Sequence, residues 1–259
     1  MVPVLVPLFG SFAIHAYGLC IVVGFIFFVY FLLRDSRYAS LYSEDFLINI
    51  LVLNTLSALV GGRILYLVSE DEVIESWFDI FAFWQGGLSV LGSIMSICLT
   101  IVTVFYFYKK PVLPFLDIAA TYAPLLQSVG RLGCFFAGCC HGFYFTGCCH
   151  VLYTDGNSLA PLCVPLFPSQ LLSSFLLFIL FLFLYFLSKK TVLQNGIFFF
   201  LYLFFASSER FFTDFFRGDR GKIYALFSFN QIISIFLMTF ALVMLFYFWC
   251  FKKTGNEKS

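Results

Sequence analysis

Charged side chains are scarce in this chain. Asp, Glu, Lys and Arg together supply 11% of its 259 residues, whereas a soluble globular domain averages about 25%. Hydrophobic residues supply 61%, and 39 of them are phenylalanine. One water-soluble core cannot enclose so much apolar surface, so a bilayer has to solvate part of it. The composition therefore predicts an integral membrane protein that crosses the bilayer several times.

Other absences narrow the function classes. The net charge is +1 and no basic stripe is present, which argues against a nucleic-acid partner. The N-terminal stretch "MVPVLVPLFG" has no basic residue ahead of its apolar run, so we expect no cleaved signal peptide. No repeat appears, and only the tail "KKTGNEKS" is of low complexity. We expect one membrane domain over residues 1–252 and a short polar cytoplasmic tail over residues 253–259.

Seven apolar segments are long enough to cross a bilayer, which takes about 20 residues in a helix. They are Ser11–Leu33, Phe46–Val68, Gly87–Tyr108, Leu113–Cys134, Ser169–Leu187, Gly196–Phe216 and Tyr224–Phe251. The fold class predicted from them is an all-α polytopic membrane protein with about seven transmembrane helices.

The orientation follows from the distribution of cations. Nine of the 15 Lys and Arg residues fall on one side of the seven-span arrangement: Arg34, Arg37, Lys109, Lys110, Lys189, Lys190, Lys252, Lys253 and Lys258. The positive-inside rule assigns that side to the cytoplasm. The N-terminus is then outside or periplasmic and the C-terminus cytoplasmic. The Cys/His-rich loop over residues 134–166 is then also outside.

The remaining six cations lie within spans or near the outer face. They are Arg63, Arg131, Arg210, Arg217, Arg220 and Lys222. Charges in spans are costly and usually face a partner or a cavity. Arg210, Asp214 and Arg217 recur at helical spacing, which predicts one shared face. Two interpretations stay open: an ion pair with Asp214 beside a snorkelling Arg217, or a cationic pocket whose guanidinium groups bind a phosphate.

The outer loop holds six of the nine cysteines, in part as "GCCHG" and "GCCH". Three uses of these thiols stay open: disulfides, a metal ion held by Cys139, His141, Cys148 and His150, or a reactive thiol. We expect disulfides rather than a metal, because thiols tend to pair in an oxidising outer compartment.

The motifs of the chain resemble, in order and nearly end to end, those of the bacterial prolipoprotein diacylglyceryl transferase family. They are "HAYGL", "GGRILYLV", "WQGGLSVLGS", "GRLGCFFAGCCHG", "FPSQL", "ERFFTDFFRGD" and "SFNQIIS". The resemblance implies transfer of a diacylglyceryl group from phosphatidylglycerol to the lipobox cysteine thiol of a preprolipoprotein, with release of glycerol phosphate. It also implies a place in the bacterial inner (cytoplasmic) membrane.

The resemblance implies roles for individual residues. The catalytic residues are expected to be Tyr17 and His15. The substrate-binding residues are expected to be Arg131, Arg217, Arg210, Arg63, Gly142 and Gln170. No cofactor and no metal are expected.

Several positions differ from the family's pattern, among them Ala137, Leu172 and Ser173. Leu91 and Phe167 each stand where the family has a histidine, while Cys134 and Cys139 stand where its signature has an amide and a carboxylate. Two alternatives to the transferase follow. One is a divergent paralogue that uses the same fold and phosphate site for other lipid or thiol chemistry. The other is a non-catalytic lipid-binding membrane protein.

Overall fold

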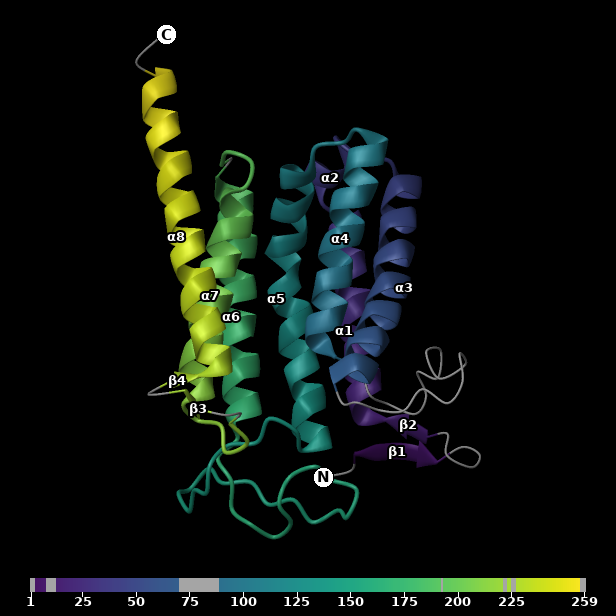
Figure 1. Cartoon of the computed structure of the whole chain (residues 1–259), viewed down its shortest axis with the longest axis vertical. Coiled ribbons are helices and arrows are strands. Elements are labelled where there is room, and N and C mark those ends of the chain that lie inside the picture. Colours follow the sequence, from purple (N-terminus) through teal and green to yellow (C-terminus); the bar gives the residue numbers. More distant parts are fainter. Residues whose placement is uncertain are drawn as a thin grey trace. The chain divides into compact units, whose positions relative to one another are not determined.

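The structure is a computed structural model that describes residues 3–7, 13–69, 89–191, 193–220, 223–224 and 227–256. The chain forms two compact units. One comprises Met1–Asp35 with Leu116–Ser259, and the other comprises Ser36–Phe115. Long helices make up most of both units (Figure 1). The predicted all-α polytopic fold class is confirmed.

The elements follow one another along the chain as two short strand pairs and eight helices within the described residues. The strands are β1 (Val4–Pro7), β2 (Ala13–His15), β3 (Ile223–Tyr224) and β4 (Phe227–Ser228), with β1 antiparallel to β2 and β3 antiparallel to β4. The helices are α1 (Ala16–Leu33), α2 (Ser36–Ala39), α3 (Glu44–Ser69), α4 (Val90–Tyr108), α5 (Val112–Ala137), α6 (Ser169–Lys190), α7 (Ile197–Asp214) and α8 (Phe229–Asn256).

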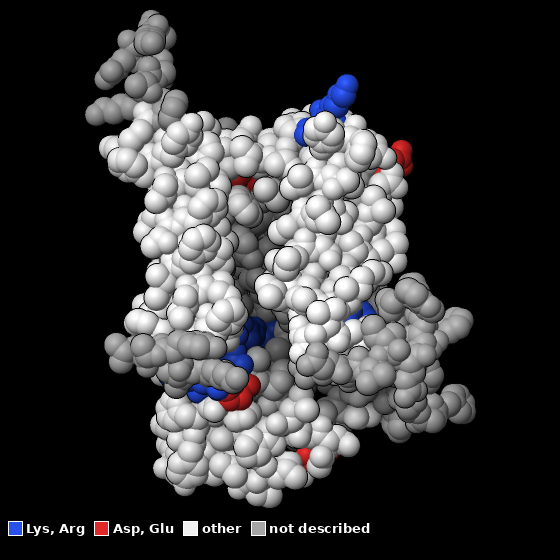
Figure 2. All heavy atoms as spheres, in the orientation of Figure 1, with Lys and Arg blue, Asp and Glu red and all other residues white. Residues whose placement is uncertain are grey.

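The long helices coincide with the seven predicted spans. Six of them, all except α7, are long and apolar enough to cross a membrane. The 18-residue α7 carries three charged residues, Glu209, Arg210 and Asp214. Large apolar side chains are exposed along the helices, and the helical surface visible in Figure 2 is nearly free of charged residues. These surfaces suit a lipid solvent.

Several predicted boundaries were wrong. The first span was expected from Ser11, but residues 13–15 pair with β1 and the helix begins at Ala16. The last span was expected from Tyr224, but Tyr224 belongs to β3, residues 227–228 form β4, and α8 begins at Phe229. Residues 87–88, at the expected start of the third span, lie outside the described residues. At the starts of α1 and α8, strand pairing provides hydrogen-bond partners for the backbone N–H and C=O groups, and an apolar sequence pattern does not reveal such pairing.

The second unit is held by a close approach of α3 and α4. The Ser93 hydroxyl of α4 donates to the Ala58 carbonyl of α3 at 2.8 Å. A Cβ on Gly92 would clash with the Gly61 carbonyl and lie 2.6 Å from the Leu65 Cβ. Small residues at such a crossing let two membrane helices approach with their backbones nearly in contact.

We therefore expect Gly92→Ala to lower the thermal stability of the protein in detergent. The added methyl meets backbone, which cannot rotate away, and overpacking of this kind costs about 1–3 kcal/mol. Gly18→Ala is the matched control, because a Cβ there has nothing within 4 Å. The midpoint of thermal unfolding should fall for the first variant and stay unchanged for the second. Equal midpoints for both variants would contradict the close approach of α3 and α4.

In the first unit, α1 and α5 run antiparallel. At one end, a Cβ on Gly133 would lie 3.2 Å from the Tyr17 Cα. At the other end, the Tyr122 hydroxyl donates to the Asp35 carboxylate at 2.7 Å. Between α5 and α6, the Ser128 hydroxyl donates to the Ser174 carbonyl at 2.8 Å.

One end of the first unit carries most of its described non-helical structure. The α5–α6 loop, the β1–β2 pair and the β3–β4 pair lie there, and α8 runs away from them to the C-terminus (Figure 1). The ends of α5 and α7 and the beginnings of α1, α6 and α8 therefore meet at one end, and the candidate site is built there.

Candidate functional site

Three of the four predicted arginines come together in the first unit. Arg131 lies near the end of α5, Arg210 near the end of α7, and Arg217 three residues beyond α7. The charges of Arg131 and Arg217 both act on Arg210. All three side chains are half-buried. A cationic cluster therefore lies at the end of the helical unit.

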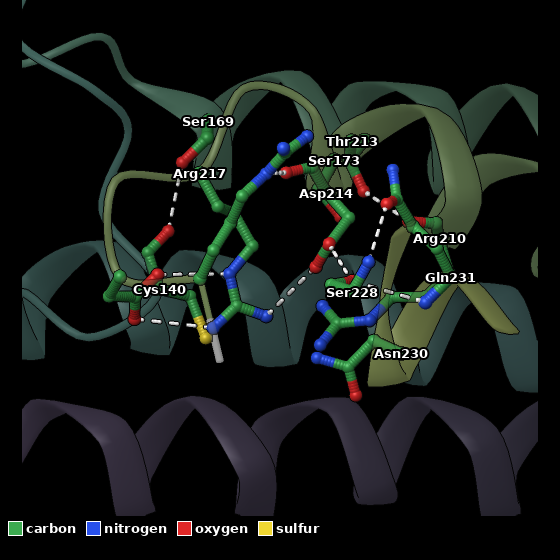
Figure 3. A network of polar contacts seen from close by, with 12 residues as sticks. Cys140, Ser169, Ser173, Arg210, Thr213, Asp214, Arg217, Ser228, Asn230 and Gln231 are labelled. Carbon is green, nitrogen blue, oxygen red and sulfur yellow. Dashed lines mark hydrogen bonds and ion pairs between the residues drawn. The ribbon is translucent and has the colours of Figure 1, made fainter. Parts of the chain in front are cut away.

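Arg217 is paired with carboxylates. Its Nε and Nη2 donate to Asp219 at 3.0 and 3.2 Å, and its Nη1 lies 3.8 Å from the Asp214 carboxylate (Figure 3). Because α7 ends at Asp214, Arg217 does not continue the helical face that its spacing predicted. The ion-pair interpretation holds for Arg217, although Asp219 supplies the closer bonds.

Arg131 and Arg210 differ from Arg217. Within the part of the chain that the structure describes, neither guanidinium makes a hydrogen bond or an ion pair. Two half-buried guanidinium groups without a carboxylate partner repel each other unless an anion lies between them. The phosphate-pocket interpretation therefore rests on Arg131 and Arg210.

A buried network holds the segment that joins α7 to α8. Asp214 is fully buried and accepts a hydrogen bond from the Ser228 hydroxyl. Its backbone carbonyl accepts from the Arg220 Nε at 2.5 Å. The Gln231 side chain accepts from the Ser228 N–H at 3.0 Å, so α8 is tied to the same point (Figure 3).

Gly142 joins the Cys/His-rich loop to two other segments. Its N–H donates to the Phe167 carbonyl at 3.1 Å, and it pairs with Arg217 across an antiparallel bridge. A Cβ on Gly142 would clash with the Phe167 carbonyl and lie 2.8 Å from the Phe167 Cβ. The glycine thus brings Arg217 beside the loop, whereas its predicted contact with substrate stays a prediction.

Gln170 lies at the beginning of α6 with 2% of its surface exposed. Its amide donates to the Cys139 carbonyl at 2.9 Å and to the Tyr153 hydroxyl at 3.3 Å. Burial raises the pKa of Tyr153 to about 12, so its phenol stays protonated and donates to the Phe135 carbonyl at 3.0 Å. These bonds make Gln170 a residue that positions the loop, and its predicted contact with substrate stays a prediction.

Replacing Gln170 with leucine should loosen the loop. The change removes the donor to the part-buried Cys139 carbonyl and one of the two hydrogen bonds of the Tyr153 hydroxyl, and an unsatisfied buried group costs about 1–3 kcal/mol. Limited proteolysis should cut between residues 138 and 168 faster in this variant than in the wild type. Gln194→Leu is the matched control, because Gln194 is exposed. Equal cleavage rates in the two variants would count against the positioning role.

The expected disulfides are absent, since all nine cysteines are free and all lie in the described part of the chain. Cys148 and Cys149 are sequence neighbours whose sulfur atoms are 3.7 Å apart and hydrogen-bonded. The prediction was wrong because the loop is fastened by backbone pairing and by buried polar side chains, without covalent links.

Three of the thiols form a cluster instead. The sulfur atoms of Cys134, Cys139 and Cys140 lie within 4.8 Å of one another. Hydrogen bonds from the Cys134 and Cys139 thiols lower the pKa of Cys140, against the effect of burial, and Arg217 and Arg131 lower it further. Hydrogen bonding to Cys134 and Cys140 raises the pKa of Cys139.

The alternative metal ligand set is not assembled among the described residues. His141 and His150 each form a ring-nitrogen hydrogen bond to a loop carbonyl, Gly142 at 3.0 Å and Gly147 at 2.8 Å. Cys148 is exposed, and its free thiol is hydrogen-bonded to that of its neighbour Cys149. Of the predicted ligands Cys139, His141, Cys148 and His150, only Cys139 belongs to the thiol cluster.

The remaining predicted residues lie in different places. Tyr17, in the first turn of α1, is close enough to Arg131 and the three clustered thiols to interact with them electrostatically. His15 ends β2 with an exposed side chain. Arg63 belongs to the second unit, where its guanidinium lies over the Tyr66 ring. The catalytic roles of Tyr17 and His15 and the lipid-binding role of Arg63 stay predictions.

Sequence reasoning missed Tyr153 and Asp219. Tyr153 is buried within the loop, in a cluster with Ala160 and Leu166, and no periodicity marks it because the loop has no regular structure. Asp219 had a signal, since it follows Arg217 by two residues in "RGDRGK". A carboxylate so close in sequence to an unexplained arginine is a candidate partner for it.

Fold and site together define a multi-pass membrane protein with a cationic, thiol-containing site where five helices begin or end. Comparison with known proteins is more specific. The family profile described as "Prolipoprotein diacylglyceryl transferase" matches residues 3–247. The chain belongs to the prolipoprotein diacylglyceryl transferase family.

Individual relatives agree with the profile over most of their length. A Clostridium perfringens protein named phosphatidylglycerol–prolipoprotein diacylglyceryl transferase 2 is 35% identical over 237 residues, which is 91% of each chain. A Clostridium tetani protein named as a transferase of the same kind is 32% identical over 91% of this chain and 93% of its own. One from Wigglesworthia glossinidia brevipalpis is 28% identical over 91% and 92%.

Proposed function

We propose that this protein transfers the diacylglyceryl group of phosphatidylglycerol to the lipobox cysteine thiol of a preprolipoprotein. The site lies in the bacterial inner membrane, with the N-terminus and the Cys/His-rich loop outside and the C-terminus in the cytoplasm. Membership of the family and the apolar helices support this proposal. The observation that carries it is the pair of half-buried guanidinium groups, Arg131 and Arg210, that have no carboxylate partner in the described residues.

The chemistry requires a fixed cation. The acceptor sulfur attacks a glycerol carbon, the bond from that carbon to the phosphate oxygen breaks, and glycerol phosphate leaves with the electron pair. The negative charge that grows on the leaving group is stabilised by donors already in place. Arg131 and Arg210 supply planar guanidinium donors suited to phosphate oxygens. Arg217, already paired with Asp219, adds positive potential and holds the loop beside them.

Tyr17 is proposed to act through its phenol hydroxyl at this site. Its phenol lies by Arg131 and the thiol cluster at the start of α1. A phenol both donates and accepts hydrogen bonds, so it suits orientation of a lipid headgroup or of the incoming thiol. His15, two residues earlier, is proposed to assist from the same segment. Arg63 is proposed to contact the lipid from the second unit.

The test is transfer by the purified full-length chain in vesicles of labelled phosphatidylglycerol. A lipobox peptide should gain the mass of one diacylglyceryl group, and the same peptide with Cys→Ser should gain none. Release of glycerol phosphate without peptide labelling would overturn the proposal in favour of other lipid chemistry. Lipid binding with no turnover would overturn it in favour of a non-catalytic lipid-binding protein.

A further inference from the structure

The thiol cluster has the dimensions of a metal site. Zinc–thiolate bonds are about 2.3 Å long, which separates the sulfur atoms of a tetrahedral site by about 3.8 Å. The sulfur atoms of Cys134, Cys139 and Cys140 all lie within 4.8 Å of one another, so small side-chain adjustments suffice to enclose one ion. The cluster lies outside the roles that the family resemblance supplied, because thiols replace an amide and a carboxylate there.

The backbone that presents these thiols is already shaped. Gly138 has φ +80° and its N–H closes the end of α5 on the Cys134 carbonyl at 2.9 Å. Cys140 has φ +56°, a left-handed conformation that is uncommon for a residue with a Cβ and indicates a constraint at that position. These two turns fold Cys139 and Cys140 back over Cys134.

Two buried side chains of α6 bind the backbone of Cys139 and Cys140. The Ser169 hydroxyl donates to the Cys140 carbonyl at 2.8 Å, and Gln170 donates to the Cys139 carbonyl at 2.9 Å. Both side chains are 2% exposed, so these bonds are shielded from water. Groups of this kind orient metal ligands and raise the affinity of a site.

The charge around the cluster suits an anionic metal–thiolate centre. Three thiolates and one divalent ion carry a net charge of −1, and Arg131 and Arg217 both act on Cys140. The group consists of sulfur ligands alone, and thiolates select zinc or copper(I) over magnesium and calcium. Three protein ligands also leave the fourth position of a tetrahedral ion open, as in catalytic zinc sites.

We propose that Cys134, Cys139 and Cys140 together bind one zinc ion whose fourth position accepts a thiol from outside the chain. The role of the fourth position rests on the proposed function, in which the outside thiol belongs to the lipobox cysteine. That thiol releases its proton to solvent and coordinates as a thiolate. Its sulfur then forms the bond to the glycerol carbon, while the electron pair of the broken carbon–oxygen bond leaves with glycerol phosphate. Zinc changes no oxidation state.

Cobalt(II) is a suitable probe, because its thiolate complexes absorb visible and near-ultraviolet light. The full-length protein, purified in detergent under reductant and stripped with a chelator, should take up one cobalt ion per chain with thiolate charge-transfer bands. Zinc should displace it. Cys134→Ser, Cys139→Ser and Cys140→Ser should each weaken cobalt binding by at least about 100-fold. Cys148→Ser and Cys163→Ser are matched controls from the same loop and should leave binding unchanged.

A second measurement needs no variant and covers the case in which a substitution disturbs folding. Zinc should protect Cys134, Cys139 and Cys140 of the wild-type chain from alkylation, as mapped by mass spectrometry, and leave Cys148, Cys149 and Cys163 reactive. Absence of stoichiometric metal, equal alkylation with and without zinc, or cobalt binding that survives all three substitutions would each overturn the site.

The open position has its own test. A lipobox peptide should change the cobalt spectrum, and its Cys→Ser form should not. No change with either peptide would overturn the role of the fourth position. The two proposals fail separately. A chain that binds metal but shows no transfer defeats the proposed function and leaves the metal site standing, whereas transfer that persists after removal of zinc and in Cys139→Ser defeats the role of the fourth position and leaves the proposed function standing.

Discussion

Arg131→Ala should lower diacylglyceryl transfer from phosphatidylglycerol to a lipobox peptide by at least about 100-fold. Removing one donor that stabilises a developing oxyanion typically costs a factor of 100 to 1000, and Arg131 is proposed to contact a full phosphate. Its side chain is half-buried, so water replaces the guanidinium poorly. The loss should appear in kcat as well as KM, because the negative charge on the leaving group grows as the carbon–oxygen bond breaks.

Two variants make this result specific. Arg34→Ala is the control, because it removes an arginine from the C-terminal end of α1, away from the site at the N-terminal end of that helix. Arg34 is exposed and lies over the Tyr30 ring, so its loss should leave transfer unchanged. Arg131→Lys keeps the charge but loses the planar fork and should recover only part of the activity. Transfer that is undamaged by Arg131→Ala, with correct membrane insertion shown, would remove Arg131 from the phosphate site.

The sequence predicted the helices well because the bilayer imposes one simple rule on them. A span must be long, apolar and hydrogen-bonded within itself, and each of these demands is visible as composition. The ends of the helices obey other rules. Ala13–His15, Ile223–Tyr224 and Phe227–Ser228 lie in apolar runs, yet they pair as short strands, because pairing depends on a partner that an apolar run does not specify.

The arginines were predicted by elimination. Arg131, Arg210 and Arg217 had no place in the topology, and a charge without a topological role in a span needs a partner. The sequence did not predict which of these arginines is ion-paired and which is not. Arg217 uses Asp219, while Arg131 and Arg210 make no such bond among the described residues. The helix α7 ends at Asp214, so the turn that follows it determines where the Arg217 guanidinium lies and which carboxylates it contacts. The sequence does not specify that turn.

The cysteines show why residue counts mislead. Adjacent thiols in an outer loop suggested covalent links, but a disulfide requires two Cβ atoms about 3.8 Å apart that point toward each other. The turn at Gly138 instead gathers three sulfur atoms, one of them from α5 itself. The spacing of Cys134, Cys139 and Cys140 does not match a familiar metal motif, so geometry alone identifies the group.

Asp214→Ala should reduce stability more than any other single change discussed above. The carboxylate is fully buried, accepts from the Ser228 hydroxyl and lies 3.8 Å from the Arg217 guanidinium. Its loss leaves a buried hydroxyl without its acceptor and removes a buried anion that acts on Arg210 and Arg217. Breaking a buried pair by removing one partner costs about 3–5 kcal/mol, which corresponds to a fall in Tm on the order of 10 °C.

Asp219→Ala is the matched control for this effect. Asp219 makes the shorter contacts to Arg217, at 3.0 and 3.2 Å, but its side chain is 32% exposed and water replaces it readily. Exposed ion pairs contribute about 0–1 kcal/mol, so the Tm of this variant should change by only a few degrees. If Asp219→Ala is as destabilising as Asp214→Ala, proximity to Arg217 decides the effect and burial does not. If Asp214→Ala alone unfolds the protein early, the buried carboxylate is what allows three arginines to share one end of the helical unit.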